Sequence, residues 1–276
     1  MRLTTLASGS SGNAIYLGDE KTNLLIDCGL TGKKTKESLK EIKVNPETVD
    51  GILVTHEHRD HIHGVGVLSR KYDLPIYATE KTWYALGCSE IGRIAEKNQQ
   101  YLTAGKAVEI GEMKLEVFAT SHDAVEPIGV VVYKGTEKVG VATDTGCITA
   151  GMEKHLKDCN ILLIEANHDE EMLEKGPYPH YLKKRIRGQE GHLDNVTTGN
   201  ALTRWISGDT QQIVLAHLSK ENNLPYLARK TVEDILTEAG INAGVEVQVT
   251  VAPREETHPL VEVIKPYWPK SDWKVG

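Results

Sequence analysis

Short apolar runs separated by polar turns extend along the whole chain and predict a protein rich in β-strands. Each run is dominated by aliphatic residues and is bounded by Gly, Ser, Asn or Asp, which is typical of strands joined by turns. The predicted strands cover residues 3–7, 13–17, 23–27, 51–55, 76–78, 107–110, 113–119, 128–133, 138–143, 161–164, 213–216 and 245–251.

Longer segments between these runs predict helices, and Thr31 is a favourable N-cap for the first of them. The predicted helices cover residues 31–42, 61–72, 81–86, 149–157, 195–206 and 225–239. A polar, turn-rich segment at 168–195 contains one further short basic helix, and the tail from residue 266 is rich in Pro and Trp. Strand-rich sections alternate twice with helices, which predicts two packed sheets with helices outside, in a single domain spanning 1–276.

Composition narrows the class of protein. With 276 residues, 39% hydrophobic and 26% charged, the chain is long enough for one well-buried α/β domain. The net charge of −7 means that a polyanionic substrate must be met by a local basic patch or by metal ions. The four cysteines include no C-x-x-C pair, and neither a signal core nor a membrane-length apolar run is present. We therefore expect a reduced, cytoplasmic protein without membrane association.

The strongest chemical signal is a run of ligand-type residues directly after the predicted strand 51–55. His56, His58, Asp60 and His61 stand within one short loop. Imidazole and carboxylate groups together suit Zn²⁺, Mn²⁺ or Fe. The plain alternative is a solvated polar loop, but so dense a cluster at the end of a buried strand favours a metal site.

Further ligand-type residues follow other predicted strands. His122, Asp144 and His217 each come after an apolar strand, and sites collect at such strand ends in layered α/β proteins. A histidine in any one of these places is more often structural, so the argument depends on all of them occurring together. Asp27 also ends a strand, where it would cap a turn or accept the free N–H of a ligand imidazole.

This order of motifs resembles the metallo-β-lactamase superfamily: an Asp at a strand end, H-x-H-x-D-H, then a His, an Asp and a final His. The resemblance covers nearly the whole chain and implies a four-layer αββα sandwich with the site at one edge, between the sheets. It also implies the ligands of two divalent ions. One ion would be held by His56, His58 and His122, the other by Asp60, His61 and His217, and Asp144 would bridge them.

The same resemblance favours hydrolysis, with a hydroxide shared by the two ions as nucleophile. Asp60 is thereby placed in the catalytic centre as well as in the ligand set. A redox di-iron member would carry Glu where this chain has His58, and many true β-lactamases carry Cys where it has Asp144. Cys147 is out of register with that position and is interpreted as a packing residue.

The segment between Asp144 and His217 is too short for the large inserted domain of the RNA-processing nucleases in this superfamily, yet it carries a basic run. On a helix such a run would form a basic face able to contact phosphates, or alternatively a solubilising surface. Two tyrosines nearby would stack on bases or simply pack. The basic residues are Lys183, Lys184, Arg185 and Arg187, and the tyrosines are Tyr178 and Tyr181.

Several stretches look like the YycJ/WalJ (VicX) branch of the superfamily. They are residues 6–13, 51–64, 121–124, 167–169, 191–192 and 216–223. That resemblance implies a bacterial, cytoplasmic 5′-to-3′ DNA exonuclease with a part in mismatch repair, using Mn²⁺ or Zn²⁺. The chain departs from the branch in carrying Asp194 where Ser is frequent and in a longer, Trp-bearing C-terminus.

We therefore predict phosphodiester hydrolysis of nucleic acid, with DNA as the substrate. His192, in a polar turn, is the candidate proton donor to the leaving 3′-oxygen, although a capping or structural role fits it equally. His168 and His180 are weaker candidates, and three other histidines (His63, His155 and His258) are expected at the surface.

Two alternatives stay open. One is a hydrolase of small esters, thioesters or lactones on the same dimetal scaffold, since the metal ligands do not distinguish the substrates. The other is a non-catalytic scaffold protein, which would be expected to have lost some of the ligands.

Overall fold

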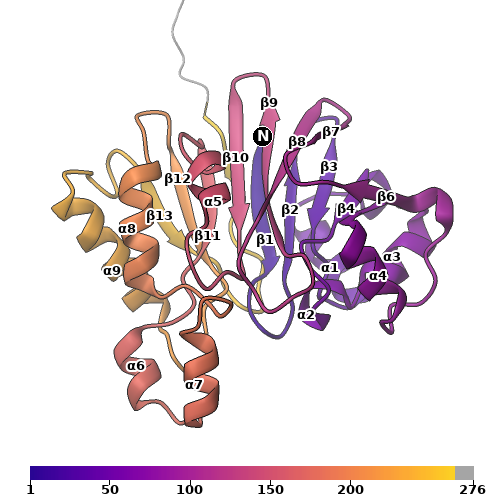
Figure 1. Cartoon of the computed structure of the whole chain (residues 1–276). Coiled ribbons are helices and arrows are strands. Elements are labelled where there is room, and N and C mark those ends of the chain that lie inside the picture. The colour runs from indigo at the N-terminus through magenta and orange to yellow at the C-terminus, as the bar shows by residue number, and fades with distance from the viewer. Residues whose placement is uncertain (265–276) are drawn as a thin grey trace, which may run out of the picture.

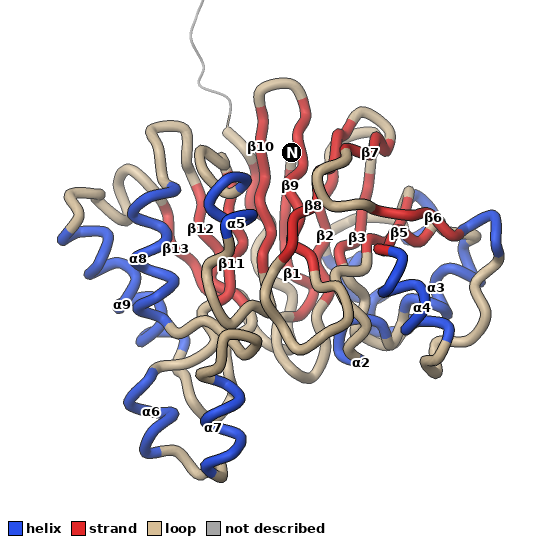
Figure 2. The backbone as a smooth tube through the Cα atoms, viewed as in Figure 1, coloured by secondary structure: helices blue, strands red, loops and turns tan. Residues whose placement is uncertain are grey.

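The computed structural model describes residues 1–264, so the Pro- and Trp-rich C-terminal tail lies outside the described residues. Within them, two seven-stranded sheets face each other, and helices cover their outer faces (Figures 1 and 2). The sheet orders are β14-β1-β2-β3-β4-β5-β6 and β13-β12-β11-β10-β9-β8-β7. The αββα sandwich expected from the sequence is thus confirmed.

The first sheet is built from the N-terminal third of the chain and one C-terminal strand. Its strands are β1 (Arg2–Ala7), β2 (Ala14–Gly18), β3 (Asn23–Ile26), β4 (Gly51–Leu53), β5 (Ile76–Thr79), β6 (Gln99–Leu102) and β14 (Val261–Glu262). The helices of this half are α1 (Gly32–Glu41), α2 (Arg59–Ile62), α3 (Val65–Tyr72) and α4 (Glu80–Gly87), with the 3₁₀ turns η1 (Pro46–Thr48) and η2 (Glu96–Asn98).

The second sheet also has seven strands and its own set of helices. Its strands are β7 (Ala107–Ile110), β8 (Met113–Ala119), β9 (Ile128–Lys134), β10 (Glu137–Ala142), β11 (Ile161–Glu165), β12 (Gln212–Ala216) and β13 (Gln248–Val251). Its helices are α5 (Ala150–His155), α6 (Glu170–Lys175), α7 (His180–Ile186), α8 (Asn195–Trp205) and α9 (Pro225–Glu238). Helices α6 and α7 form an arm that projects below the sandwich (Figure 1).

Buried side chains explain why the strands read as continuous apolar runs. In β11, Ile161 and Leu163 point into the core between the sheets, whereas Leu162 and Ile164 pack against α8 and α9 on the outer face. Both faces of such a strand are shielded from solvent, so polar residues do not alternate with apolar ones. A third cluster packs α1, α3 and α4 against the outer face of the first sheet.

Strand direction decides where the loops gather. Each sheet begins with antiparallel strands and continues with parallel ones, from β3 to β6 and from β10 to β13. Strand β2 is antiparallel to both β1 and β3, so β1 and β3 point in the same direction. Strand β9 is likewise antiparallel to both β8 and β10, so β8 and β10 point in the same direction. The loops that follow β1, β3 and β4 therefore meet those that follow β8, β10, β11 and β12 at one edge of the sandwich.

Three local predictions were wrong. The helix predicted at 61–72 is divided into α2 and α3, because the Gly64 N–H bonds to the Cys28 carbonyl at 2.7 Å instead of continuing the helical hydrogen bonds. The arm holds two helices where one was predicted. His258 is buried, with 4% of its surface exposed, because its backbone bonds to Thr4 and Thr5 of β1.

Asp194, a departure from the YycJ/WalJ pattern, has a structural role. Its carboxylate accepts hydrogen bonds from the backbone N–H groups of Val196 and Thr197 and caps α8. Serine is an equally good N-cap residue, so the exchange keeps the same local structure.

Candidate active site

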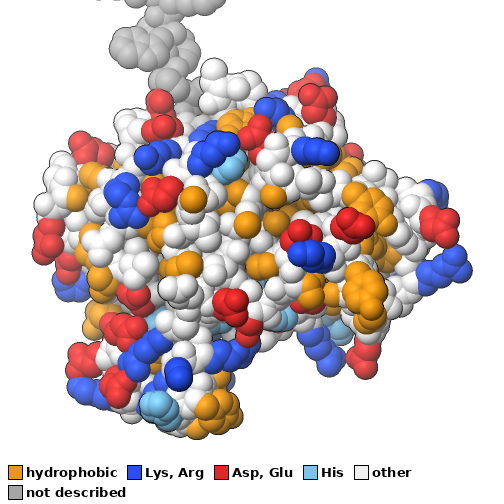
Figure 3. All heavy atoms as spheres, in the orientation of Figure 1, with side chains coloured by type: hydrophobic (Ala, Val, Ile, Leu, Met, Phe, Trp, Pro, Cys, Tyr) orange, Lys and Arg blue, Asp and Glu red, His pale blue; other side chains and the backbone are white. Residues whose placement is uncertain are grey.

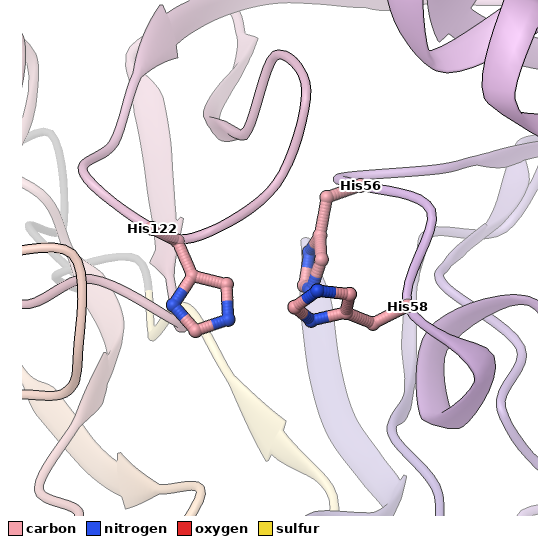
Figure 4. A group of neighbouring side chains, drawn as sticks. All are labelled: His56, His58 and His122. Atoms are coloured by element: carbon pink, nitrogen blue, oxygen red, sulfur yellow. The ribbon is translucent and has the colours of Figure 1, made fainter. Parts of the chain in front are cut away.

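The predicted ligand residues converge at the edge where the strand-end loops meet. His56, His58 and His122 form the first cluster, whose ligand atoms lie within 4.8 Å of one another. Figure 4 shows His56 and His58 on a single loop, facing His122 on the loop that follows β8. Asp60, His61 and His217 form the second cluster within the same distance limit.

Asp144 lies between the two clusters. One carboxylate oxygen, Oδ2, is 3.3 Å from His61 Nε2, and the other, Oδ1, is 3.2 Å from His217 Nδ1 and 3.8 Å from His122 Nε2. The carboxylate is almost fully buried. It is therefore in position to contact ions held by either cluster.

A protein group outside the clusters contacts one ring nitrogen of each cluster imidazole, and the other ring nitrogen faces the site. This arrangement fixes ring orientation and is typical of metal-binding histidines. The outer contacts are His56 Nδ1 to Thr55 Oγ1 (3.0 Å), His58 Nε2 to the Asp123 carbonyl (3.2 Å), His61 Nδ1 to Asp27 Oδ2 (2.7 Å), His122 Nδ1 to the Gly191 carbonyl (3.1 Å) and His217 Nδ1 to Glu165 Oε1 (3.0 Å).

Several of the inward-facing atoms are buried without a hydrogen-bond partner among the described residues. They are His56 Nε2, His217 Nε2 and Asp144 Oδ2. Leaving buried polar atoms unpaired costs free energy, so such atoms in one cluster require an explanation. Cations bound among them would satisfy all three at once. The donor set therefore fits divalent ions, and the clusters indicate a dimetal site.

Backbone conformation at the site is unusual for residues other than glycine. Asp27, Asp144 and His217 have φ of 59°, 56° and 57°, in the left-handed region. Asp27 and His217 directly follow β3 and β12, and Asp144 lies two residues after the end of β10, so in each case the turn directs the side chain toward the site. For His217 the conformation is held by Ser8, whose hydroxyl accepts its N–H, and by Asn167, whose amide donates to its carbonyl.

Asp27 links the site to the strands beneath it. Besides His61, its carboxylate accepts hydrogen bonds from the backbone N–H of Thr55 at 2.8 Å and from the Thr55 hydroxyl at 2.7 Å. Because that hydroxyl donates to Asp27, it accepts from His56 Nδ1. One buried carboxylate thus orients an imidazole of each cluster.

The electrostatics of the two clusters differ. Burial lowers the pKa of both His56 and His122, and the neighbouring His61 lowers that of His56 further. In the second cluster burial is outweighed: Asp144 and Asp27 raise the pKa of His61 to about 10, and Asp144 and Glu165 raise that of His217 to about 9. Without metal, His56 and His122 are therefore neutral at pH 7, whereas His61 and His217 are protonated.

Glu165 is a site residue that the sequence analysis missed. It is fully buried at the end of β11, and its Oε1 lies 2.7 Å from His192 Nδ1 and 3.0 Å from His217 Nδ1. Despite burial, these two imidazoles lower the pKa of Glu165 to about 2. Its signal, an acid directly after an apolar strand, is the same one that marks Asp144.

His192 lies at the site, whereas the weaker donor candidates do not. Its ring centroid is 5.0 Å from that of His122 and 5.2 Å from that of His217, and its side chain is 17% exposed. By contrast His168 is buried beside Asp194, and His180 begins α7 at the surface.

The basic run does not form one uninterrupted face. Arg187 pairs with Glu170 and Glu174 of α6, and Arg185 pairs with Asp123 beside the first cluster. Lys183 donates to the Glu174 carbonyl, and only Lys184 of the run has no partner within residues 1–264. Figure 3 accordingly shows cationic and anionic side chains interspersed over the arm.

No helix within residues 1–264 is long and apolar enough to cross a membrane.

Comparison with known proteins places this geometry in a family. Residues 22–218 match the family model described as a beta-lactamase superfamily domain. The chain is 43% identical to "Exodeoxyribonuclease YycJ" of Bacillus anthracis, over 88% of this chain and 92% of that one. It is 42% identical to "Exodeoxyribonuclease WalJ" of Streptococcus pneumoniae, over 95% of this chain and 98% of that one.

Solved structures confirm the fold at low sequence identity. The metallo-β-lactamase fold protein YhfI of Bacillus subtilis superposes with a TM-score of 0.70 at 16% identity, covering 93% of this chain and 98% of its own. Zn²⁺-bound PqqB of Methylobacterium extorquens gives 0.67 at 13%, covering 94% and 99%. Fold, site and sequence agree, and the chain belongs to the metallo-β-lactamase superfamily and, within it, to the YycJ/WalJ family of metallo-hydrolases.

Proposed function

We propose that this protein is a metal-dependent phosphodiesterase that degrades DNA from the 5′ end, with a role in DNA repair. The observation that carries the proposal is the pair of ligand clusters joined by Asp144, in a chain 42–43% identical to proteins named exodeoxyribonucleases over most of their length. Removing a strand from its 5′ end is a step that excision repair requires.

In this proposal the first cluster would hold one divalent ion and the second cluster another, with Asp144 available as a ligand to both. Mn²⁺ and Zn²⁺ both suit such imidazole and carboxylate sets. Bound there, such ions would acidify coordinated water and neutralise charge on a phosphoryl group. Side chains of the protein itself would have to supply the proton for the leaving group.

Glu165 and His192 supply the remaining proton chemistry. When the P–O3′ bond breaks, the leaving 3′-oxygen needs a proton, and His192 is the donor. Its Nδ1 is held by the Glu165 carboxylate, so Nε2 is the nitrogen that gives up the proton. Glu165 orients the ring through this contact, and the partial exposure of His192 lets solvent return the proton after each turnover.

The test uses metal-reconstituted protein on DNA duplexes that carry a blocking group on either the 5′ or the 3′ ends. We expect divalent-ion-dependent release of nucleotides from DNA whose 3′ ends are blocked, and protection by 5′ blocks. The same preparation is assayed on a panel of thioesters and lactones. Turnover of those compounds with no action on DNA would replace this proposal by the small-molecule alternative.

Metal loading should depend on pH differently at the two clusters. Since His61 and His217 have raised pKa values of about 10 and about 9, an ion entering the second cluster must displace protons. Its affinity should rise between pH 7 and 9, by up to about tenfold per pH unit for each proton released. The first cluster, where the pKa values of His56 and His122 are lowered, should change little over that range.

Titration calorimetry in two buffers of different ionisation enthalpy measures the protons released by each ion. Equal proton release at both steps, or an affinity for the second ion that falls as pH rises, would contradict this prediction.

Asp27→Asn should weaken metal binding without removing a ligand. The carboxylate that accepts His61 Nδ1–H at 2.7 Å would lose its charge, and changes to such orienting partners cost about 10–100-fold in metal affinity. We expect that loss mainly for the second ion, measured by competition with a chromophoric chelator. Asp50→Asn is the matched control, because Asp50 also accepts a backbone N–H, that of Asn23, but at the opposite ends of the same strands. Equal losses in both variants would assign the effect to general stability.

A further inference from the structure

A small polar cavity of about 230 Å³ opens beside the second cluster. Its volume is below the roughly 300–1,000 Å³ of pockets that enclose whole small molecules, so it suits a single chemical group. It is lined by Ser10, Ser11, Gly29, Arg59, Asp60 and His63. The lining thus offers two hydroxyls, a guanidinium and an imidazole next to a predicted metal ligand.

The donors in this cavity are uncommitted. Within residues 1–264, neither the hydroxyl nor the backbone N–H of Ser10 or Ser11 makes a hydrogen bond, and the Arg59 guanidinium and the His63 ring have no polar partner. All four residues are exposed. Hydroxyls, backbone N–H groups and guanidinium are the groups that bind phosphate oxygens in proteins.

Ser10 and Ser11 belong to the loop of residues 9–13, the serine loop, which is fixed relative to the site. Asn13 closes it by accepting the Gly9 N–H at 2.8 Å through its side chain, and the Gly12 N–H bonds to the Gly9 carbonyl. The Asn13 side-chain amide donates to Asp60 Oδ2 at 3.2 Å and lies 2.9 Å from His61 Nε2. The free donors are therefore held at a set position beside the second cluster, which lowers the entropy cost of binding a ligand.

The cavity lined by Ser10, Ser11 and Arg59, the serine cavity, lies on the opposite side of the site from the arm of α6 and α7. Another hollow, lined by Ser121, Asp123 and Arg185 among others, borders the first cluster, whereas the serine cavity borders Asp60 of the second. A strand whose scissile phosphate lies between the clusters thus has room for its neighbouring phosphates on either side.

We propose that the serine cavity binds the 5′-terminal phosphate of the strand being degraded, an inference that rests on the proposed function. Attack of water on the scissile phosphorus breaks the P–O3′ bond, releases the terminal nucleotide with a 3′-hydroxyl and leaves a 5′-phosphate on the shortened strand. Each turnover therefore regenerates the group for which the cavity offers donors. The Asp60 carboxylate on its wall repels this anion unless a cation neutralises it, so binding requires the loaded site.

The test compares two duplexes of one sequence, 3′-labelled, with either a 5′-phosphate or a 5′-hydroxyl. Charge-assisted hydrogen bonds to the phosphate should make the first substrate better by about tenfold or more in kcat/KM. In Arg59→Ala, and in Ser10→Ala combined with Ser11→Ala, that ratio should fall toward one. Arg93→Ala, at an exposed arginine that does not line the cavity, should keep the wild-type ratio.

A binding measurement separates this inference from the proposed function. Thymidine 5′-monophosphate should bind the metal-loaded protein more tightly than thymidine, and the serine variant should abolish the difference even if no DNA is degraded. Equal rates on both duplexes, with the cavity variants slowing both alike, would assign the cavity to an internal phosphate and overturn the proposal. Equal binding of the nucleotide and the nucleoside would overturn it as well.

Discussion

Asp144→Asn should remove almost all hydrolytic activity, by about 10³-fold or more, and lower the bound metal from two ions to one or fewer per chain. Asp144 is the carboxylate between the clusters, with one oxygen 3.3 Å from His61 Nε2 and the other 3.2 Å from His217 Nδ1. Although burial opposes ionisation, the surrounding imidazoles hold its pKa well below the usual range, so it is an anion at all working pH values. An amide supplies neither that charge nor a second anionic oxygen.

The loss should exceed the roughly 10–100-fold typical of residues that only orient a ligand. Metal content by mass spectrometry and kcat/KM on 5′-phosphorylated DNA measure the two effects. Far-UV circular dichroism should show a folded protein, because asparagine tolerates the left-handed backbone almost as well as aspartate.

Asp73→Asn is the matched control for that backbone argument. Asp73 has the same φ of 56°, but it ends α3 and binds Lys97 and Asn98 at the surface. We expect unchanged activity and metal content in this variant. If Asp144→Asn keeps two ions and more than about a tenth of the activity, the bridging role is wrong.

The part of the site that the sequence predicted has one physical basis. Asp27, Asp144 and His217 each follow an apolar strand, and the strands that carry them run the same way within their sheets. Their strand ends must then meet at the same edge, so a local pattern was enough to bring together residues far apart in the chain. Glu165 carries the same pattern and could have been predicted with them.

Other contacts depend on how separate segments dock, and no local pattern contains them. The pairing of Arg185 with Asp123 requires the arm to fold back toward the loop after β8. The burial of His258 requires the short strand β14 to pair with β1. The edge strand β6 was missed because its residues are largely polar and only partly buried, which gives neither an apolar run nor alternation.

His192→Gln should lower turnover by about 10²–10⁴-fold, the usual contribution of a general acid, while leaving both ions bound. The amide of glutamine can still donate to Glu165 Oε1, which accepts His192 Nδ1–H at 2.7 Å in the native site, but it has no proton to give to a leaving group. Unlike His217, which shares Glu165, His192 belongs to neither the first nor the second cluster, although its ring lies within 4.8 Å of the ligand atoms of Asp144, Glu165 and His217. Metal content measured alongside kcat separates the two roles.

The decisive substrate has sulfur in place of the bridging 3′-oxygen at the scissile linkage. A thiolate leaves without being protonated, so a defect caused by loss of a proton donor should shrink on this substrate by about 10-fold or more. His180→Gln, an exposed histidine at the start of α7, should behave as the native protein on both substrates. An equal defect of His192→Gln with oxygen and sulfur leaving groups would show that His192 only positions its neighbours, and the proton would then have to come from solvent.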